Sequence, residues 1–323
     1  MGDEDRVTEM KTKFMKQFPC TDEGDMVEYV GSKTDYCQET GRLKLTQPVL
    51  LKSLEDEFPP SKRSKPPDTP AIAGSVLTKS GTKLSPEKQK MLAKLVGKEL
   101  FMSWSRPEAA NPVREVSRHM TEGTEEAMDQ AMRIRDYFIA TKQRGRIIAP
   151  QRNFNDIDRG EELIIRGISD ANYATDPETR KSVTGLIVYL EDAVVASGSK
   201  GQNGPALATT EAEFSAAVAA AQTMVHAMNI VVSLGFKVKT PMILEVDNKG
   251  VVDLANGFSV GGRSKHYDVK LFYIRELKHV DLLRIIHVAG VDNQSDMLTK
   301  NLTGPLIGKH SQTMVTDERI GKG

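Results

Sequence analysis

Cysteine and long hydrophobic runs are both scarce in this chain of 323 residues. Cys20 and Cys37 are too few for a disulfide framework, and the charged N-terminus lacks the apolar core of a secretion signal. We therefore expect reduced thiols and an intracellular location, cytoplasmic or nuclear. No apolar run approaches the ~18 residues that a transmembrane helix needs, so no membrane partner is expected.

Net charge is also lacking, because 44 lysines and arginines balance 44 aspartates and glutamates. No overall basic field therefore marks the chain as a nucleic-acid-binding protein, although a local basic stripe beside a site would serve as well. The composition, 39% hydrophobic and 27% charged, is ordinary for a globular protein, and the length allows two domains.

The first half of the chain combines short elements, a linker and a helical region. Residues 26–31 and 42–46 alternate like the two strands of a hairpin, and apolar side chains at helical spacing predict a helix over residues 48–58. Two Pro–Pro pairs predict an extended, solvated linker over residues 59–86. Residues 87–150 are expected to be mainly helical, beginning after a Ser–Pro capping signal.

Beyond residue 155 the pattern changes to alternating strands and helices, which predicts an α/β domain that ends near residue 302. Residues 198–205 are glycine-rich and are expected to be a loop, without the spacing of a phosphate-binding motif. Residues 303–323 are expected to be a frayed tail. The expected strands cover residues 162–170, 182–190, 193–197, 242–247 and 282–288, and the expected helices cover residues 209–234, 249–255, 268–278 and 294–300.

Four acidic residues far apart in the sequence lie near the ends of these elements. Asp170 and Asp247 each end an apolar run that is predicted to be a strand, whereas Glu213 and Asp296 fall in the first turn of predicted helices. Two strand ends and two helix starts can bring four carboxylates into one pocket. Hard cations such as Mg²⁺ and Mn²⁺ prefer oxygen ligands. Two such ions can activate a water and stabilise the leaving oxygen of a phosphodiester, so the pattern predicts a nuclease site.

Each carboxylate also has a purely structural explanation. Asp170 could be a solvated strand end, and Asp247 could cap the helix that follows it. Glu213 belongs to a Thr-Glu-Ala-Glu capping box, and Glu211 in that box is its rival for the metal role. Asp296 could merely complement a helix dipole. The residues alone leave these alternatives open.

Short motifs in both halves of the chain carry a family resemblance. Those of the second half are Ser169–Tyr173, Asp176–Gly185, Thr209–Phe214, Val246–Asn248, Arg263–Val269 with Ile274–Glu276, and Ser295–Lys300. They resemble, in order, the ribonuclease H domain that closes copia-type retrotransposon polyproteins. The first half resembles, more loosely, the end of the reverse transcriptase of the same polyprotein, and Trp104 and Glu108 depart from its usual pattern. Those looser motifs lie at residues 29–31, 43–48, 95–97, 105–107, 116–120 and 135–137.

The resemblance implies a fold and a domain order. Residues 155–302 would form a ribonuclease H-like domain, a mixed five-stranded sheet with flanking helices. A smaller, mainly helical domain with a short β-hairpin would precede it. Residues 1–58 would be a thumb-like remnant of the transcriptase, residues 59–86 a linker, residues 87–150 a helical connection region and residues 303–323 a tail. The polymerase palm would lie upstream of residue 1, so no polymerase activity is expected from this chain.

The resemblance also selects among the carboxylates. The family places its catalytic glutamate directly before an aromatic residue, which favours Glu213 over Glu211. The Met-Leu-Thr-Lys sequence that follows favours Asp296 over Asp292. The implied reaction is hydrolysis of the RNA strand of an RNA–DNA hybrid with two Mg²⁺ or Mn²⁺ ions. The implied metal ligands and catalytic residues are Asp170, Glu213, Asp247 and Asp296.

Further residues are candidates for supporting roles. His287 lies near the place where other ribonuclease H lineages carry a mobile histidine, which could aid proton transfer or product release, although many copia-type sequences lack it. Arg180, Lys181 and Lys265 could contact hybrid phosphates, and Asn248 could bond a 2′-hydroxyl. Exposed charges commonly do no more than interact with solvent. The implied partners are the hybrid and the upstream transcriptase.

Two other interpretations compete with the nuclease. The chain could be an inactive retroelement fragment that keeps the fold and at most binds nucleic acid, or a structural connection module. A vacant carboxylate cluster gains stability when a divalent cation binds, so metal-dependent melting separates the enzyme from both alternatives.

Overall fold

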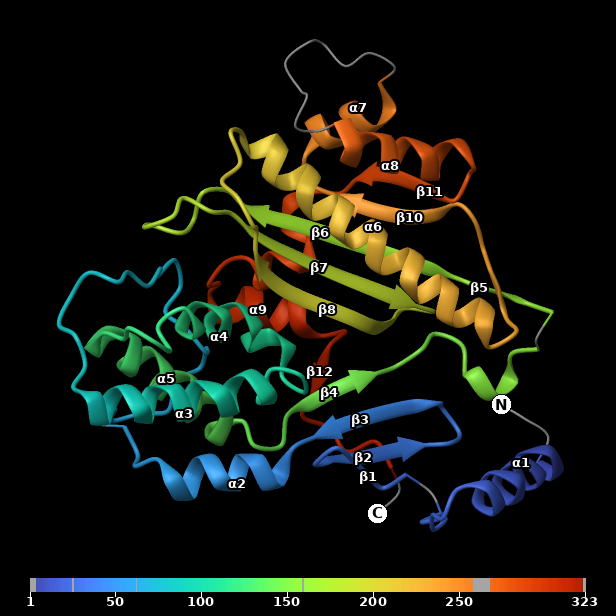
Figure 1. Ribbon diagram of the computed structural model, residues 1–323, viewed down its shortest axis with the longest axis horizontal. Helices are drawn as coiled ribbons and strands as arrows, with labels where there is room; N and C mark the ends of the chain where they lie inside the picture. Colours follow the sequence, from blue (N-terminus) through green and yellow to red (C-terminus); the bar gives the residue numbers. More distant parts are fainter. Residues whose placement is uncertain (1–3, 25, 62, 159, 258–267, 322–323) are drawn as a thin grey trace.

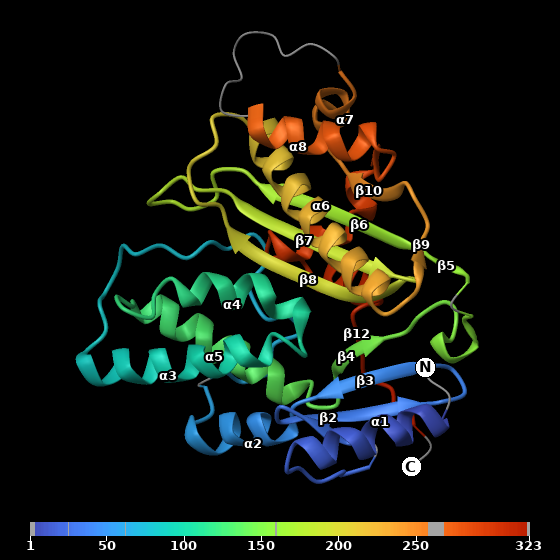
Figure 2. The ribbon, with the colours of Figure 1, turned by 45° about the vertical axis from the view of Figure 1, so that its right-hand side comes forward.

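The computed structural model describes residues 4–321 except residues 25, 62, 159 and 258–267. It contains two five-stranded sheets and a block of helices. In Figure 1 the sheet built mainly from the second half of the chain lies above, and the helical block and the other sheet lie below it. The last residues of the chain cross from the upper part to the lower one (Figures 1 and 2).

The upper sheet is built around the buried strand β6, Ile165–Asn172. On one side β7, Val183–Leu190, pairs antiparallel with β6, and β8, Ala193–Gly201, pairs antiparallel with β7. On the other side β10, Met242–Val246, and β11, Leu283–His287, are added in parallel. The mixed five-stranded sheet of the predicted ribonuclease H-like fold is thus confirmed. β8 is longer than expected, because the first residues of the predicted glycine-rich loop continue the strand.

Helix α6, Thr209–Ser233, crosses one face of this sheet (Figures 1 and 2). Its alanine-rich face and Phe214 are buried against the strands. The helix approaches closely because β6 carries Gly167, where an added Cβ would lie 2.6 Å from Sδ of Met224. By length and composition α6 is the one helix among the described residues that could cross a membrane, and here it is the core helix of a sheet.

Two shorter helices follow the predicted positions. α7 covers Lys249–Asn256, one residue longer than expected, and α8 covers Asp268–His279. Both contribute buried side chains to the core that α6 forms with the sheet, among them Val251 and Ile274.

The opposite face of the sheet is covered by the end of the chain, which corrects the expected tail. The 3₁₀-helix η5, Gln294–Leu298, the helix α9, Gly304–Ser311, and the strand β12, Val315–Thr316, follow one another here. Met297, Leu298, Met314 and Val315 pack with apolar side chains of the sheet. A frayed tail would leave such side chains in water, and their burial favours the packed arrangement.

The lower sheet has the order β1-β2-β3-β4-β12, with β12 paired to β4. The expected hairpin exists, but its first strand is shifted along the chain. Val30 and Gly31 have positive φ angles and form a turn, so the partner of β3 is the segment after that turn and not residues 26–31. The strands are β1, Glu28–Tyr29, β2, Ser32–Cys37, β3, Arg42–Thr46, and β4, Gly145–Ile148.

The helical block packs around an apolar core of its own. Its helices are α2, Pro48–Glu57, α3, Pro86–Met102, α4, Ala110–Ser117, and α5, Glu125–Ala140. The capping signal is confirmed, because the Ser85 side chain accepts a hydrogen bond from the Lys88 amide at the start of α3. The remaining elements are α1, Glu4–Gln17, η1, Pro107–Ala109, η2, Phe154–Asp156, β5, Glu162–Leu163, β9, Lys237–Val238, and η4, Gly290–Asp292.

The described residues of the predicted linker form no helix or named strand before α3 begins at Pro86, but they are not simply solvated. Thr69, Ala71 and Leu77 are buried. The carbonyl of Thr69 accepts from Nε of Arg133, and the amide of Leu77 donates to the Glu115 carboxylate. These contacts with α4 and α5 hold the segment along the helices, which a count of prolines could not reveal.

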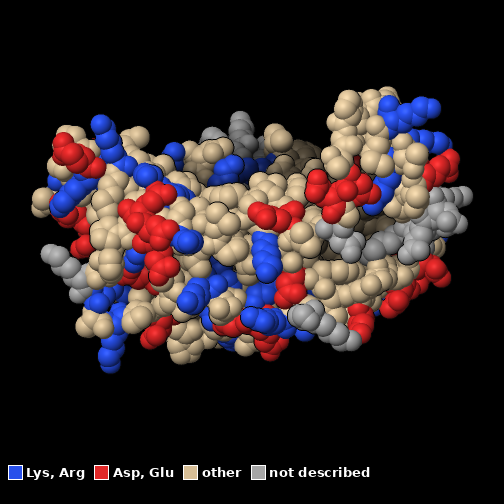
Figure 3. Space-filling view, turned by 90° about the horizontal axis from the view of Figure 1, so that it is seen from below, with Lys and Arg blue, Asp and Glu red and all other residues tan. Residues whose placement is uncertain are grey.

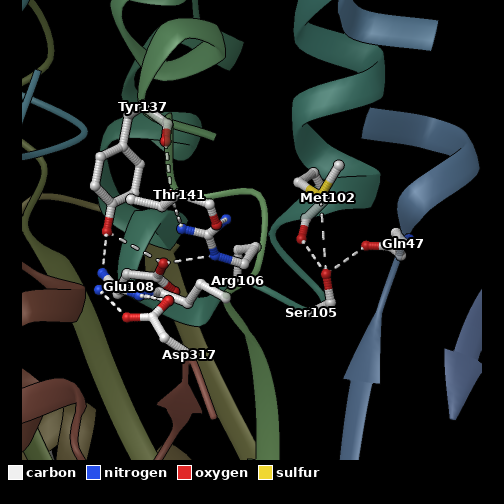
Figure 4. A network of polar contacts seen from close by, with 9 residues as sticks. Gln47, Met102, Ser105, Arg106, Glu108, Tyr137, Thr141 and Asp317 are labelled. Carbon is white, nitrogen blue, oxygen red and sulfur yellow. Dashed lines mark hydrogen bonds and ion pairs between the residues drawn. The ribbon is translucent and has the colours of Figure 1, made fainter. Parts of the chain in front are cut away.

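A buried polar network ties the helical block to the end of the chain (Figure 4). Arg106 and Glu108 are almost fully buried and form an ion pair of 2.7 Å between Nε and Oε1. The Tyr137 hydroxyl also lies within hydrogen-bond distance of Glu108. Arg144 bonds the Tyr137 hydroxyl and pairs with Asp317 near the C-terminus. Glu108, one of the two departures from the family pattern, is thus paired with a buried cation in this chain, through its Oε1.

Candidate active site

Three of the four predicted carboxylates meet at one end of the upper sheet. Asp170 lies near the end of β6, Asp247 directly follows β10, and Glu213 lies near the start of α6. One oxygen of each lies within 4.8 Å of the others. The strands explain the first pair, because Val246 is in register with Ser169, so the next residues, Asp247 and Asp170, are neighbours on parallel strands.

Glu213 is held in this group by the backbone of β6. The amide of Ala171 donates a 2.9 Å hydrogen bond to Oε2 of Glu213. Its rival Glu211 instead accepts a 2.6 Å bond from the amide of Leu207, just before α6, and so lies outside the cluster. The capping function of the sequence motif therefore belongs to Glu211.

The environment of the three carboxylates disfavours their charged forms. Asp170 is 1% exposed and Glu213 is 7% exposed. Burial, followed by the charges of Asp170 and Asp247, raises the pKa of Glu213 to about 8. Burial and then Asp170 raise the pKa of Asp247, and burial raises the pKa of Asp170 despite a nearby lysine. Such a group of carboxylates gains most from a bound cation.

The oxygen set fits a divalent metal ion. Two ligands on opposite sides of a magnesium ion are about 4.2 Å apart, twice the ~2.1 Å bond length. Adjacent ligands of such an ion are ~3.0 Å apart, so the three oxygens, which lie within 4.8 Å of one another, would draw together to share one ion. All three donors are carboxylates, which hard cations prefer. Asp170, Glu213 and Asp247, hereafter the carboxylate triad, would hold that ion.

Asp296 lies next to the triad but is bonded to a lysine. Its Oδ1 is 2.7 Å from Nζ of Lys300, and the same Nζ is 3.4 Å from Oδ2 of Asp170. The hydroxyl of Thr299 donates to Oδ2 of Asp170 as well. Burial lowers the pKa of Lys300, but Asp170 and Asp296 outweigh burial and raise it overall. Asp292, the other candidate, pairs with Lys309 on the surface.

The turn that carries Asp296 and Lys300 is fixed from two sides. Asn293, fully buried, donates to the carbonyl of Ser169 in β6 and accepts from the amide of Ser295. Asn301 donates to Glu115 in α4 at 2.7 Å and to the carbonyl of Ser75 at 2.9 Å. The helical block therefore contributes directly to the position of the residue that follows Lys300.

Sequence reasoning did not identify Lys300 or Asn301 as site residues. Lys300 ended the Ser295–Lys300 motif and stands four residues after Asp296, a spacing that allows an ion pair on one helical turn. That spacing was the available signal. The approach of Lys300 to Asp170 depends on the packing of η5 against β6 and has no local signal.

The remaining candidate residues are not members of the triad. His287, exposed at the end of β11, is in register with Val246, the residue before Asp247. Arg180 is exposed in the segment between β6 and β7, and Lys181 beside it is partly exposed. Asn248 caps α7 by accepting from the amide of Val251. Lys265 lies outside the described residues.

Charge on the molecular surface is mixed. Figure 3 shows Lys and Arg interspersed with Asp and Glu on the face seen from below. This distribution accords with the zero net charge. The roles of His287, Arg180, Lys181 and Asn248 stay predictions.

Comparison with known proteins gives relatives among plant transposons. No family model matches the chain. The chain is similar to the retrovirus-related Pol polyprotein from transposon TNT 1-94 of Nicotiana tabacum, with 28% identity over 322 residues, 96% of this chain and 23% of that protein. It is also similar to the Pol polyproteins from transposons RE1 and RE2 of Arabidopsis thaliana, with 29% and 28% identity over 74% of this chain and 16% of each protein. The predicted similarity to copia-type polyproteins is confirmed, and the chain spans less than a quarter of these relatives.

Among solved structures, the chain has partial similarity to ribonucleases H. LC11-RNase H1, isolated from compost, is 17% identical with a TM-score of 0.33 and covers 42% of this chain and 91% of its own. RNase H1 from Halobacterium salinarum is 20% identical with a TM-score of 0.29 and covers 42% of this chain and 94% of its own. LC11-RNase H1 has also been solved in complex with an RNA/DNA hybrid.

Proposed function

We propose that this chain is the ribonuclease H part of a retrotransposon polyprotein and that it hydrolyses the RNA strand of RNA–DNA hybrids with divalent metal ions. The observation that carries the proposal is the convergence of three carboxylates from separate parts of the fold, the buried Asp170 and Glu213 and the half-buried Asp247. Similarity to transposon Pol polyproteins along 96% of the chain supports the biological setting. The upstream transcriptase of such a polyprotein is the proposed protein partner.

The carboxylate triad would hold a Mg²⁺ or Mn²⁺ ion, with Asp296 as a further ligand for a second ion. Bound ions of this kind supply Lewis-acid activation of water and of the scissile phosphodiester. The Ala171 amide orients Glu213, and the Thr299 hydroxyl orients Asp170, so the ligands are positioned before any ion arrives. His287, exposed at the end of β11, would be the residue that assists proton transfer in this proposal.

Cleavage of a labelled hybrid tests the proposal. The full chain with MgCl₂ should cut the RNA strand of the hybrid and leave double-stranded DNA intact. Asp247→Asn should abolish cleavage, because it removes one of three charged ligands. Asp253→Asn, on the exposed side of α7, is the matched control and should cleave like the parent chain. Absence of cleavage by the parent chain, or equal cleavage by Asp247→Asn, refutes the proposal.

A second candidate is an inactive module that keeps the fold and at most binds nucleic acid. One observation favours it: Lys300 already compensates part of the negative charge around Asp170, so the fold has an internal source of stabilisation. This candidate predicts a folded chain whose melting temperature does not respond to Mg²⁺, and hybrid binding, if present, that is unaffected by Asp247→Asn.

A further inference from the structure

Lys300 occupies a defined position within the proposed site. Its Nζ bridges two carboxylates, at 2.7 Å from Oδ1 of Asp296 and 3.4 Å from Oδ2 of Asp170. Among the described residues it is the one lysine or arginine with an ion pair to any of the four predicted ligands. Asp170 thus belongs to two groups: the carboxylate triad on one hand, and the pair with Lys300 and Asp296 on the other.

The ammonium group and a second metal ion would compete for the same carboxylates. A divalent ion that bridges Asp170 and Asp296 needs an oxygen of each at about 2.1 Å. Lys300 contacts one oxygen of each carboxylate, Oδ2 of Asp170 and Oδ1 of Asp296, so its ammonium group lies between the two carboxylates that such an ion would bridge. Two cations cannot share this space, since their mutual repulsion adds to the steric conflict.

We propose that the ammonium group of Lys300 occupies the position between Asp170 and Asp296 that a second divalent ion would take. The chain therefore binds one divalent ion tightly and a second one weakly. The inference rests on the proposed function, because the tight site is the carboxylate triad. Lys300 is a positioning residue in this scheme. It acts through the carboxylates and sets the order in which ions bind.

The side chain of Lys300 is able to leave this place. The side chain is 38% exposed, so the ammonium group can move into water without first being buried elsewhere in the protein. Its backbone stays fixed, because the neighbouring Thr299 and Asn301 are bonded to Asp170 and to the helical block. A second ion would therefore bind by displacing the lysine head group while the turn itself stays in place.

Titration with Mn²⁺, followed by calorimetry and by the paramagnetic resonance signal of free Mn²⁺, tests the inference. The parent chain should show one tight site and a second site that fills only at much higher concentration. Lys300→Gln should tighten the second site by about tenfold, the equivalent of one moderate charge pair. Lys300→Arg keeps the charge and should behave like the parent chain. Lys309→Gln removes a comparable 2.8 Å ion pair on the surface and is the matched control.

The outcomes separate this inference from the proposed function. A parent chain that binds Mn²⁺ and cuts the hybrid, together with an unchanged second site in Lys300→Gln, overturns the inference alone. A loss of tight binding in Lys300→Gln also overturns it, because Lys300 would then support the triad. If neither chain binds Mn²⁺, both the inference and the metal-dependent function fail. Circular dichroism of each variant checks that it is folded.

Discussion

Two buried groups of charged side chains in this molecule differ in how their charges are balanced. In the helical block, Glu108 is paired with Arg106, so the chain supplies both signs (Figure 4). At the end of the upper sheet Lys300 is the one lysine or arginine of the described residues that forms an ion pair with the carboxylate triad, and the pKa of Glu213 is raised to about 8. A balanced pair needs nothing from outside, whereas an unbalanced one is stabilised by an added cation. The first group therefore serves the fold, and the second is the candidate for function.

Breaking the balanced pair should have the largest effect on stability. Arg106→Met leaves the Glu108 carboxylate buried without its cation, which costs about 3–5 kcal/mol in comparable pairs. Urea denaturation of the metal-free protein measures this loss. Lys142→Met, on the exposed neighbouring turn, is the control and should change stability by less than about 0.5 kcal/mol. A small loss for Arg106→Met would mean that the pair is not the compensated group described above.

Removing a charge from the triad should raise the stability of the metal-free protein, whereas breaking the Arg106–Glu108 pair lowers it. Glu213→Gln relieves the repulsion with Asp170 and Asp247 and keeps an oxygen for the Ala171 amide. Metal-free protein at pH 8 should gain at most about 4 kcal/mol of unfolding free energy, because the pKa of Glu213 is raised from 4.5 to about 8 and each pKa unit corresponds to about 1.4 kcal/mol. Glu211→Gln, on the same helix outside the cluster, keeps an oxygen for the Leu207 amide and should change the unfolding free energy by less than about 0.5 kcal/mol. A destabilised Glu213→Gln would contradict the unbalanced character of the triad.

The pH dependence of stability follows from the same carboxyl group. The pKa of Glu213 is raised from 4.5 to about 8 in the folded protein, so folding favours its protonated form. That contribution is present at low pH and is lost as pH rises from about 4.5 to about 8. Metal-free parent protein should therefore lose stability across this window relative to Glu213→Gln, and saturating Mg²⁺ should remove the difference. Parallel pH profiles of the two proteins would contradict the assignment.

The smallest expected effect on stability concerns Asn301, which connects the helical block with the candidate site. Asn301→Ala removes the amide that donates to the buried Glu115 carboxylate, which should cost about 1–2 kcal/mol in urea denaturation. Because Asn301 follows Lys300, Mn²⁺ affinity should also change. Asn203→Ala, at an exposed position, is the control. An unchanged Mn²⁺ affinity in Asn301→Ala would show that the helical block does not position the site.

The sequence was sufficient for the parts of the molecule that local patterns determine. The apolar runs that end near Asp170 and Asp247 became neighbouring strands, and the apolar stripe that starts near Phe214 became the core helix. Because both strands are parallel and in register, their acidic ends had to lie together. The family resemblance then supplied the expected mixed five-stranded sheet, which the structure has.

The parts that depend on distant contacts were not predictable in the same way. β12 has two residues and exists because β4 offers an open edge. Residues 59–86 follow the helices because Thr69 and Leu77 find partners on α5 and α4. Lys300 reaches Asp170 only after η5 packs against β6. In each of these cases the deciding partner is far away in the sequence.

Thermal melting with increasing MgCl₂ tests the central claim most directly, because it compares the parent chain with Asp247→Asn without requiring catalysis. A cation that binds only the folded triad at one hundred times its dissociation constant adds about 2.7 kcal/mol of stability. The melting temperature of the parent chain should therefore rise with MgCl₂ while that of Asp247→Asn stays constant. Equal shifts in both proteins, or no shift in the parent chain, would contradict the claim that the three carboxylates form a cation-binding site.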